Sequence, residues 1–284
     1  MVKTILFPSS FLDRKQIDED MINEYNACLK TGLFDVVIFG YDEWFNNHEL
    51  KISNVPEEMT ETVYRGWMMK PEDYSDFYED LLKQNVRLVT TPEMYERMHI
   101  FPNVYPEIEK DTARTLTCPL YAQIDINAVK QQFPRFMVKD YVKSVKGTEF
   151  PPFFGSEITQ EEFDKWMEVF YQYRSGLLTG GICIKEYLDL KKYTGRTNEY
   201  RVFYVDHKVL SICRNSLQER STAEPPKELI EKYCELGSIF YTLDFAELED
   251  GSWKIIEAGD GSVSGLSNGQ NYERFFSDLY HTLN

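Results

Sequence analysis

The sequence predicts an α/β protein in which an N-terminal parallel-sheet lobe is followed by α+β lobes. Two observations predict this fold. The N-terminal half alternates strand-like and helical runs, an order that builds parallel sheets, whereas the C-terminal half carries strands joined directly by tight turns. The chain has 284 residues, of which 42% are hydrophobic and 15% aromatic, so a large core is expected.

The N-terminal lobe is predicted from strand-like runs that alternate with helical ones. Residues 2–7 (VKTILF) form an apolar strand, and residues 13–30 follow as a helix with apolar side chains at helical spacing. Residues 34–40 (FDVVIFG) are rich in β-branched side chains and predict the second strand. The remaining elements predicted here are strands at 61–69 and 85–91 and helices at 71–84 and 92–99.

Residues 101–125 are rich in proline and threonine, so we expect them to be irregular. We place the main boundary in this stretch, between an N-terminal α/β domain at 1–115 and a second domain at 116–284. Within the second domain we expect a central lobe at about 134–182 and a C-terminal lobe at about 183–284.

The second half begins with residues 134–147, which predict a strand that runs into a Lys/Gly loop. Residues 158–174 predict a helix, because Thr159 and Glu162 have the spacing of a capping box. The other predicted elements are a strand (180–188), two hairpins (198–215 and 238–261) and two helices (225–237 and 269–283).

The composition excludes some functions. A net charge of −16 argues against general binding of nucleic acids or anionic membranes, because both depend on summed positive charge. Five dispersed cysteines without a CxxC pair indicate reduced thiols, and four dispersed histidines argue against a zinc site. No apolar run has the length of a signal peptide or a membrane span, so we expect a soluble, cytoplasmic protein.

Charged residues stand at the ends of the predicted strands in the C-terminal half. Lys139 ends one strand, and Lys146 with Gly147 lies in the following loop, an arrangement suited to a polyphosphate. Glu199 and Arg201 are two apart and therefore share one face of their strand. The other charged residues at strand ends are Glu186 and Arg214.

A set of acids occupies the last predicted hairpin. Asp244 and Glu257 lie on its two strands, and Asp260 follows in a glycine-containing loop. Hard divalent cations take oxygen ligands, and Mg²⁺ usually combines one or two carboxylates with phosphate oxygens. Each feature alone can also be explained as a solvated loop, an exposed ion pair or an ordinary hairpin end. Their order along successive strands favours a nucleotide triphosphate site.

This order resembles the ATP-grasp superfamily over about residues 134–270. The resemblance implies α+β lobes that clamp ATP and Mg²⁺ between them. It implies that Lys139 contacts the α-phosphate and that Lys146 and Gly147 belong to a mobile loop over the phosphates. The resemblance also gives Asp244 and Glu257 the role of bridging Mg²⁺ ions.

The same resemblance implies the rest of the nucleotide site. Glu186 would accept from the adenine amino group through its backbone, Tyr187 and Leu188 would line the adenine slot, and Glu199 would bind ribose. Arg201 and Arg214 would approach the triphosphate or the acceptor. The usual motif has an asparagine two residues after the metal glutamate, where this chain has Gly259. Either Asp260 replaces that ligand through a shifted loop, or the second metal is held differently.

The stretch VYRGWMM in the N-terminal half is similar to a clade of phage and bacterial ATP-grasp proteins that are predicted amide ligases. Arg65 at a strand end would hold an acceptor carboxylate or acyl-phosphate, since a guanidinium binds such groups bidentately. An equal alternative is a structural arginine that stacks on Trp67.

The function implied by the resemblance is an ADP-forming ligase that joins a carboxylate to an amine through an acyl-phosphate. Its substrates would be small molecules or peptides, and such ligases are often dimers. Two alternatives stay open: an ATP-dependent nucleic-acid end-joining or phosphoryl-transfer enzyme, and a non-catalytic nucleotide-binding relic. The net charge counts against the first, and the retained metal carboxylates count against the second, because buried like charges are costly without a cation.

Overall fold

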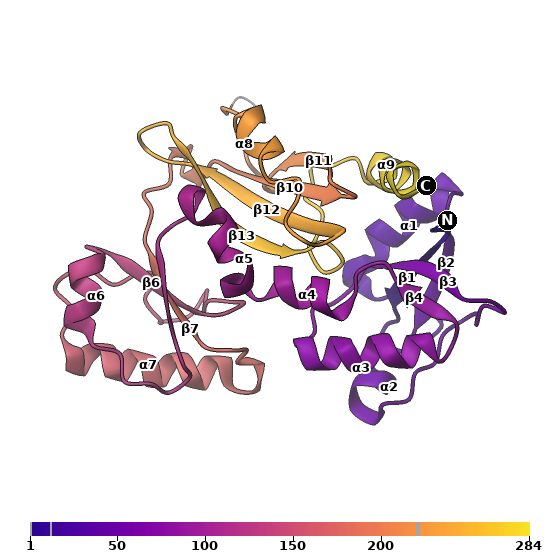
Figure 1. Ribbon diagram of the computed structural model, residues 1–284, viewed down its shortest axis with the longest axis horizontal. Helices are drawn as coiled ribbons and strands as arrows, with labels where there is room; N and C mark the ends of the chain where they lie inside the picture. Colours follow the sequence, from indigo (N-terminus) through magenta and orange to yellow (C-terminus); the bar gives the residue numbers. More distant parts are fainter. Residues whose placement is uncertain (1, 12, 220–221) are drawn as a thin grey trace.

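The computed structural model describes residues 2–11, 13–219 and 222–284 (Figure 1). The N-terminal lobe is built on a four-stranded sheet in the order β2-β1-β3-β4, and every pairing in it is parallel. The predicted parallel-sheet lobe is therefore confirmed. Its strands are β1 (Thr4–Pro8), β2 (Asp35–Phe39), β3 (Thr60–Tyr64) and β4 (Val86–Leu88).

The first helix is shorter than predicted. Residues 13–18 form a turn in which Asp13 and Asp18 accept hydrogen bonds from nearby backbone N–H groups, and this competes with a helix. A 3-10 turn (Glu19–Met21) then leads into α1 (Ile22–Thr31). The other helices of this lobe are α2 (Tyr41–Asn47), which was not predicted, α3 (Pro71–Leu82) and α4 (Pro92–His99).

The expectation that residues 101–125 are irregular is wrong. They contain α5 (Phe101–Ile108), a 3-10 turn (Glu109–Asp111) and strand β5 (Thr115–Cys118). Phe101, Val104 and Ile108 lie on one buried face of α5, and this packing holds the helix despite Pro106 inside it.

The central lobe has a three-stranded antiparallel sheet in the order β5-β7-β6, with β6 at Phe136–Asp140 and β7 at Ile182–Glu186. Helices α6 (Ile126–Gln132) and α7 (Gln160–Arg174) accompany it. The predicted capping box is confirmed, because Thr159 accepts from the backbone of Glu162 while the Glu162 side chain accepts from Thr159.

The C-terminal sheet is a four-stranded antiparallel sheet in the order β11-β10-β12-β13, and both predicted hairpins are present. The first hairpin turns at Asp206 and His207, which both have positive φ as a type I′ turn requires. The elements here are β10 (Glu199–Val205), β11 (Lys208–Arg214), β12 (Phe240–Glu247), β13 (Trp253–Asp260), α8 (Lys227–Glu231) and a small hairpin of β8 (Lys192–Tyr193) and β9 (Arg196–Thr197). Helix α8 is shorter than the predicted 225–237, because the chain tightens into turns after it.

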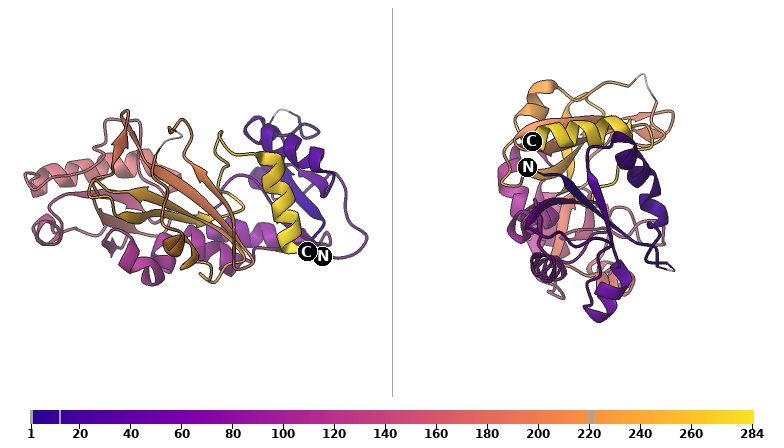
Figure 2. Two further views of the ribbon diagram at one scale, coloured as in Figure 1. Left: turned by 90° about the horizontal axis from the view of Figure 1, so that it is seen from above. Right: turned by 90° about the vertical axis from the view of Figure 1, so that its right-hand side faces the viewer.

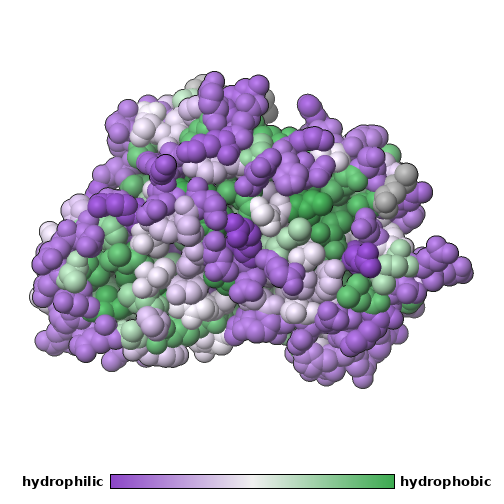
Figure 3. Space-filling view, viewed as in Figure 1, coloured by the Kyte–Doolittle hydropathy of each residue, from purple (hydrophilic) through white to green (hydrophobic). Residues whose placement is uncertain are grey.

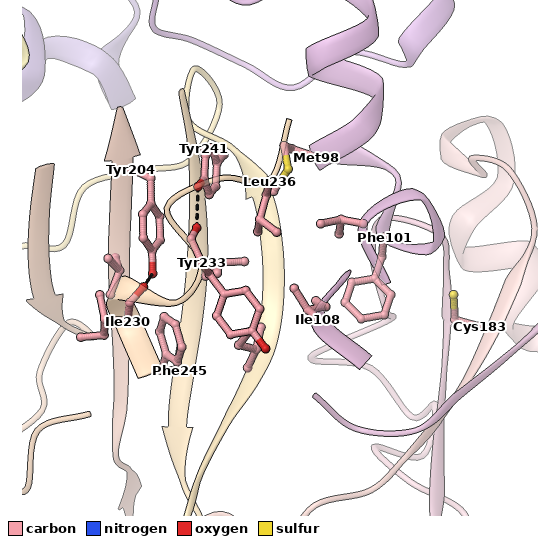
Figure 4. Close-up of a cluster of buried hydrophobic side chains, with 14 residues drawn as sticks. Met98, Phe101, Ile108, Cys183, Tyr204, Ile230, Tyr233, Leu236, Tyr241 and Phe245 are labelled. Atoms are coloured by element: carbon pink, nitrogen blue, oxygen red, sulfur yellow. Dashed lines mark hydrogen bonds between the residues drawn. The ribbon is translucent and has the colours of Figure 1, made fainter. Parts of the chain in front are cut away.

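One buried cluster joins the central lobe to the C-terminal sheet (Figure 4). Tyr204 and Tyr241 stack on the sheet with ring centroids 4.9 Å apart, and each hydroxyl donates to a backbone carbonyl. Phe101 of α5 extends the cluster toward Cys183 of β7. Since these residues come from both lobes, their packing sets the spacing of the cleft between them.

The chain ends beside its beginning (Figure 2). Helix α9 (Tyr272–Leu283) packs against α1, and the Asn284 side chain exchanges hydrogen bonds with the Val2 backbone. On the surface, hydrophilic residues predominate around separate hydrophobic patches (Figure 3). Within the described residues, no helix has both the length and the apolar character needed to cross a bilayer.

Candidate nucleotide and metal site

The register of β12 and β13 brings the two predicted metal carboxylates together. Asp244 and Glu257 are directly paired across the hairpin, so their side chains leave the same face of the sheet. The register shifts immediately afterwards, because Phe245 pairs with Ile255 and leaves Ile256 as the extra residue of a β-bulge. The bulge re-aims the end of β13 and sets Glu257 over the cleft.

Asp244 is already engaged by an arginine in this structure. Arg201 of β10 donates to both Asp244 carboxylate oxygens, from Nε at 2.8 Å and from Nη2 at 2.7 Å, and from Nη1 to the Gly265 carbonyl. Burial disfavours the charged guanidinium, but the Asp244 carboxylate outweighs it and raises the pKa of Arg201. The predicted catalytic arginine therefore lies beside the predicted metal ligand.

Lysines from the central lobe face Glu257. The Lys139 side chain is almost fully buried, and its Nζ lies 4.0 Å from Glu257 Oε1. Burial alone would raise the pKa of Glu257, yet the charges of Lys139, Lys143 and Lys146 overcome it and lower that pKa. Glu257 is therefore held ionised between a cationic strand and its metal-ligand partner.

Lys143 was missed by the sequence analysis, which chose the lysines on either side of it. Its side chain lines the cavity, and burial lowers its pKa. The buried carboxylate of Asp140 accepts from the backbone N–H groups of Val142 and Lys143, and it pairs with Arg174 at 2.8 Å. Asp140 thus fixes the start of the Lys/Gly loop, which an Asp followed by a loop could have indicated.

Lys185 was also missed, because it sits inside an apolar strand. Its Nζ donates at 2.7 Å to the carbonyl of Ile256, the residue that the β-bulge removes from the ladder. The same Nζ lies 4.3 Å from the centre of the Phe101 ring. Burial, followed by the charge of Lys139, lowers the pKa of Lys185 to about 7. The interior of the cleft therefore holds a compact pair of lysines.

These groups line a cavity of about 270 Å³. Gly259, at the position where the resemblance expects an asparagine, faces Thr242 across the hairpin. The Thr242 and Ser264 hydroxyls lie 2.9 Å apart beside it, so neutral oxygens replace the expected amide. The remaining residues of the lining are Met68, His99, Val142, Lys143, Arg201, Asp244, Glu257, Ala258, Asp260, Val263 and Gly265.

Asp260 lies three residues beyond Glu257 on β13, so its side chain leaves the opposite face of the strand. It is fully buried and accepts from the backbone N–H of Ser262 through Oδ1, while its Oδ2 has no hydrogen-bond partner among the described residues. Burial raises its pKa to about 7. The structure does not bring Asp260 to the side of the hairpin shared by Asp244 and Glu257.

The residues predicted to bind the nucleoside lie outside this cavity. Glu186 forms a bidentate ion pair with Arg114, and Glu199 accepts from Thr197 and Asn215. The Tyr187 ring lies between the Phe153 ring and the Arg135 guanidinium, and Leu188 follows it after β7 ends. Lys146 is exposed in the loop beside Gly147, whose φ of +73° suits glycine.

Arg214 does not join the site. It pairs with Tyr200 rather than Arg201, so it lies on the other face of the sheet. It lines a separate cavity of about 580 Å³ and donates to Glu224 at 3.2 Å. Sequence reasoning could not place the two arginines on different faces, because the register across the hairpin decides it.

Arg65 is also outside the cavity, directly behind the loop that closes it. Its guanidinium donates to both carboxylate oxygens of Glu24 and to the carbonyls of Gly261 and Ser264. It does not stack on Trp67 but lies 5.9 Å from the rings of Phe203 and Phe275. The structural alternative is thus favoured by geometry, with different partners from those expected.

The donor set fits Mg²⁺. Asp244 and Glu257 supply adjacent hard oxygen ligands, and the neutral hydroxyls of Thr242 and Ser264 lie next to them. Within the described ranges there is no group of three or more acidic, histidine or cysteine side chains arranged for a metal. Two carboxylates are nevertheless what Mg²⁺ requires when phosphates provide the other oxygens.

Solved structures share this fold at low sequence identity. D-cycloserine synthetase DcsG is 14% identical with a TM-score of 0.65, over 99% of this chain and 100% of that chain. The ATP-grasp ligase PsnB, complexed with a precursor variant, Mg and ADP, is 11% identical with a TM-score of 0.63, over 100% of both chains. The D-alanine-D-alanine ligase from Coxiella burnetii is 9% identical with a TM-score of 0.62, over 99% and 94%.

No curated protein matches the sequence. A family model for the ATP-grasp domain, the third family of its clade, matches residues 127–279. This stretch contains the paired carboxylates, the lysine-bearing strands and Arg201, and it covers more than half of the chain. The predicted α/β fold with an N-terminal parallel-sheet lobe and two following lobes is the fold of ATP-grasp ligases. The chain belongs to this ATP-grasp domain family.

Proposed function

We propose that this protein is an ATP- and Mg²⁺-dependent ligase that joins a carboxylate to an amine through an acyl-phosphate and releases ADP. The observation that carries the proposal is the in-register pair of Asp244 and Glu257, which faces Lys139 and Lys143 across one cavity. Carboxylates for a metal opposite cations for phosphates are what phosphoryl transfer requires. The substrates would be small molecules or peptides that carry a carboxylate or an amine.

The lysines would neutralise the triphosphate. Lys139 and Lys185 lie on neighbouring antiparallel strands, and Lys143 begins the loop that follows. Their positive charge would stabilise the negative charge on the transferred phosphoryl group, in a site where burial strengthens electrostatic interactions. Bound Mg²⁺ would neutralise phosphate oxygens and so reduce their repulsion of the attacking carboxylate.

The ion pair between Arg201 and Asp244 would have to open before Asp244 could bind the metal. Both Asp244 oxygens accept from Arg201, so the arginine and the cation compete for the same ligand. Once released, Arg201 would be free to donate to a phosphate or to the acyl group. The exchange would place a guanidinium at the reacting centre only after the metal has bound.

The rest of the nucleotide site follows the family resemblance. The exposed loop with Lys146 and Gly147 would close over the phosphates and exclude water from the acyl-phosphate. Glu186, Tyr187 and Leu188 would hold the adenine, and Glu199 would hold the ribose. Opening of the Arg114–Glu186 pair is not required for this, since Glu186 would act through its backbone.

A nucleotide-binding relic is the competing function that one observation favours. Arg201 neutralises Asp244, and the lysines neutralise Glu257, so the carboxylates are compensated even without a metal. Their retention therefore does not by itself require catalysis. Release of ADP is the property that separates a ligase from a relic.

Thermal unfolding with MgATP, with Mg²⁺ alone and with ATP plus a chelator tests nucleotide binding. A ligand that binds only the folded state stabilises it by about 2.7 kcal/mol at one hundred times its Kd. We expect a rise in Tm that needs both metal and ATP. Glu257→Gln should lose this rise, whereas Glu249→Gln, an exposed acid in the hairpin turn, should keep it.

ADP release is then measured with MgATP and pools of the common amino acids as carboxylate and amine donors. Release that depends on the pool, and that Glu257→Gln abolishes, supports the ligase. A protein that binds MgATP but releases no ADP with any carboxylate would be a relic. A protein whose Tm is unchanged by millimolar MgATP would contradict the proposed nucleotide site itself.

A further inference from the structure

His99 also lines the cavity, and the mechanism proposed above gives it no role. It is the last residue of α4, so it belongs to the N-terminal lobe and lies on the wall opposite the lysine-bearing strands. Helix α4 packs against β13, the strand that carries Glu257 (Figure 1). His99 therefore approaches the reacting centre from a lobe that supplies none of the proposed phosphate or metal ligands.

The orientation of the imidazole is fixed by stacking. Its ring lies on the Tyr95 ring, with centroids 4.8 Å apart and planes at 20°, and Tyr95 in turn stacks on Tyr74 at 3.9 Å and 3°. The Tyr95 hydroxyl both donates to and accepts from the backbone of Met69. A ring at the end of such a column has little rotational freedom, so its nitrogens keep one direction.

The ring nitrogens are available to a bound molecule. Across residues 2–11, 13–219 and 222–284, no side chain or backbone group forms a hydrogen bond with the His99 imidazole. The side chain is nonetheless buried, at 7% exposure. A buried polar group normally finds a partner in the protein, and one that faces a cavity without a partner points to a ligand.

The charges around His99 keep it neutral in the free protein. Burial, followed by the charges of Lys143 and Lys139, lowers its pKa to about 4. The other ionisable groups that line the same cavity are Arg201, Asp244, Glu257 and Asp260. A bound triphosphate would offset the lysine charges, so the imidazole would become a stronger base when the nucleotide is present.

We propose that His99 accepts the proton of the incoming amine in the amide-forming step, a role that rests on the ligase function proposed above. At neutral pH the amine enters as R–NH₃⁺ and cannot attack until one proton leaves. His99 takes that proton, and the freed lone pair forms the C–N bond to the acyl carbon. The C–O bond to phosphate then breaks with its electron pair on phosphate, which takes the second N–H proton. The imidazolium returns its proton to water.

The neighbouring acids are less suited to this step. Asp244 is held by Arg201 and, with Glu257, is reserved for the metal. Asp260 points from the opposite face of β13. A neutral imidazole can accept a proton without adding negative charge beside a phosphate, which favours His99 for the task.

Proton NMR of the histidine rings tests the electrostatic part directly. The chain has four histidines, so His99→Asn assigns the His99 resonance and His281→Asn, an exposed residue of α9, serves as the control. We expect a pKa for His99 well below the ordinary value in the free protein and a rise when Mg²⁺ and a non-hydrolysable ATP analogue bind. An ordinary pKa, or one that bound nucleotide leaves unchanged, would overturn the role.

The catalytic part is tested with MgATP and the amino-acid pool that supports ADP release. In His99→Asn, amide formation should fall about 100-fold, the smaller effect typical of a lost general base. Hydroxylamine, which is largely unprotonated at neutral pH, should restore product as a hydroxamate in that variant. A purely structural loss would not be rescued in this way.

The two proposals fail in different ways. If the wild-type protein neither binds MgATP nor releases ADP, the ligase function is wrong and His99 has no reaction to serve. If the wild-type protein forms an amide and His99→Asn forms it at the rate of the His281→Asn control, only the role of His99 is wrong. Equal loss with amines and with hydroxylamine would likewise reject proton transfer by His99.

Discussion

Replacing Arg65 with methionine should destabilise the fold strongly, because this arginine is a buried partner of a buried acid. The Arg65 side chain is 2% exposed and the Glu24 side chain 8%, and the shortest distance between them is 2.7 Å. Arg65→Met has a similar volume, but it leaves the Glu24 charge without its partner and the carbonyls of Gly261 and Ser264 without donors.

The magnitude follows from these contacts. Removing one partner of a buried ion pair costs about 3–5 kcal/mol, and the unsatisfied carbonyls act in the same direction without adding in full. Equilibrium unfolding in urea measures the change. Arg274→Met is the matched control, since Arg274 and its partner Asp278 are largely exposed and their pair is worth at most about 1 kcal/mol.

A double variant separates the cost of the unpaired charge from a general packing defect. Arg65→Met combined with Glu24→Leu removes both charges, and such replacements of buried pairs often recover the stability or raise it by about 1–4 kcal/mol. We therefore expect the double variant to be more stable than Arg65→Met alone. The reasoning is refuted if Arg65→Met costs no more than Arg274→Met, or if adding Glu24→Leu lowers the stability further.

Two further predictions concern buried ionisable groups. The folded-state pKa of Asp260 is raised to about 7, so its contribution to stability is full below about pH 4 and is lost as the pH rises through 7. Asp260→Asn should remove this decline, which the Tm measured across that range would reveal; an unchanged pH profile would contradict it. Lys185 has its pKa lowered to about 7, so its burial costs stability at low pH and the cost disappears toward pH 10. Lys185→Met should stabilise the nucleotide-free protein near neutral pH and weaken MgATP binding, whereas a uniform loss of stability at every pH would show that the lysine is a structural support.

The order of elements could be predicted from the sequence because local patterns carried it. β-Branched runs marked the strands of the N-terminal sheet, and Thr159 with Glu162 marked the start of α7. Residues 101–125 escaped this reasoning, because their prolines outweigh a weak apolar period when no partner surface is in view. Helix α5 exists because Phe101, Val104 and Ile108 pack against the C-terminal sheet, which is distant in sequence.

The sequence by itself determined the chemical types present: lysines after one strand, and acids on the strands of a hairpin. It also determined that Asp244 and Glu257 belong together, since a hairpin fixes local pairing through its turn. Only the tertiary structure decided which other side chains meet them. A one-residue difference in register sends Arg201 to Asp244 and Arg214 to the far face, and a β-bulge leaves the Ile256 carbonyl for Lys185. Side-chain direction alternates with every residue of a strand, and contacts between lobes depend on packing at long sequence distance, so His99 becomes part of the site only when the lobes close around it.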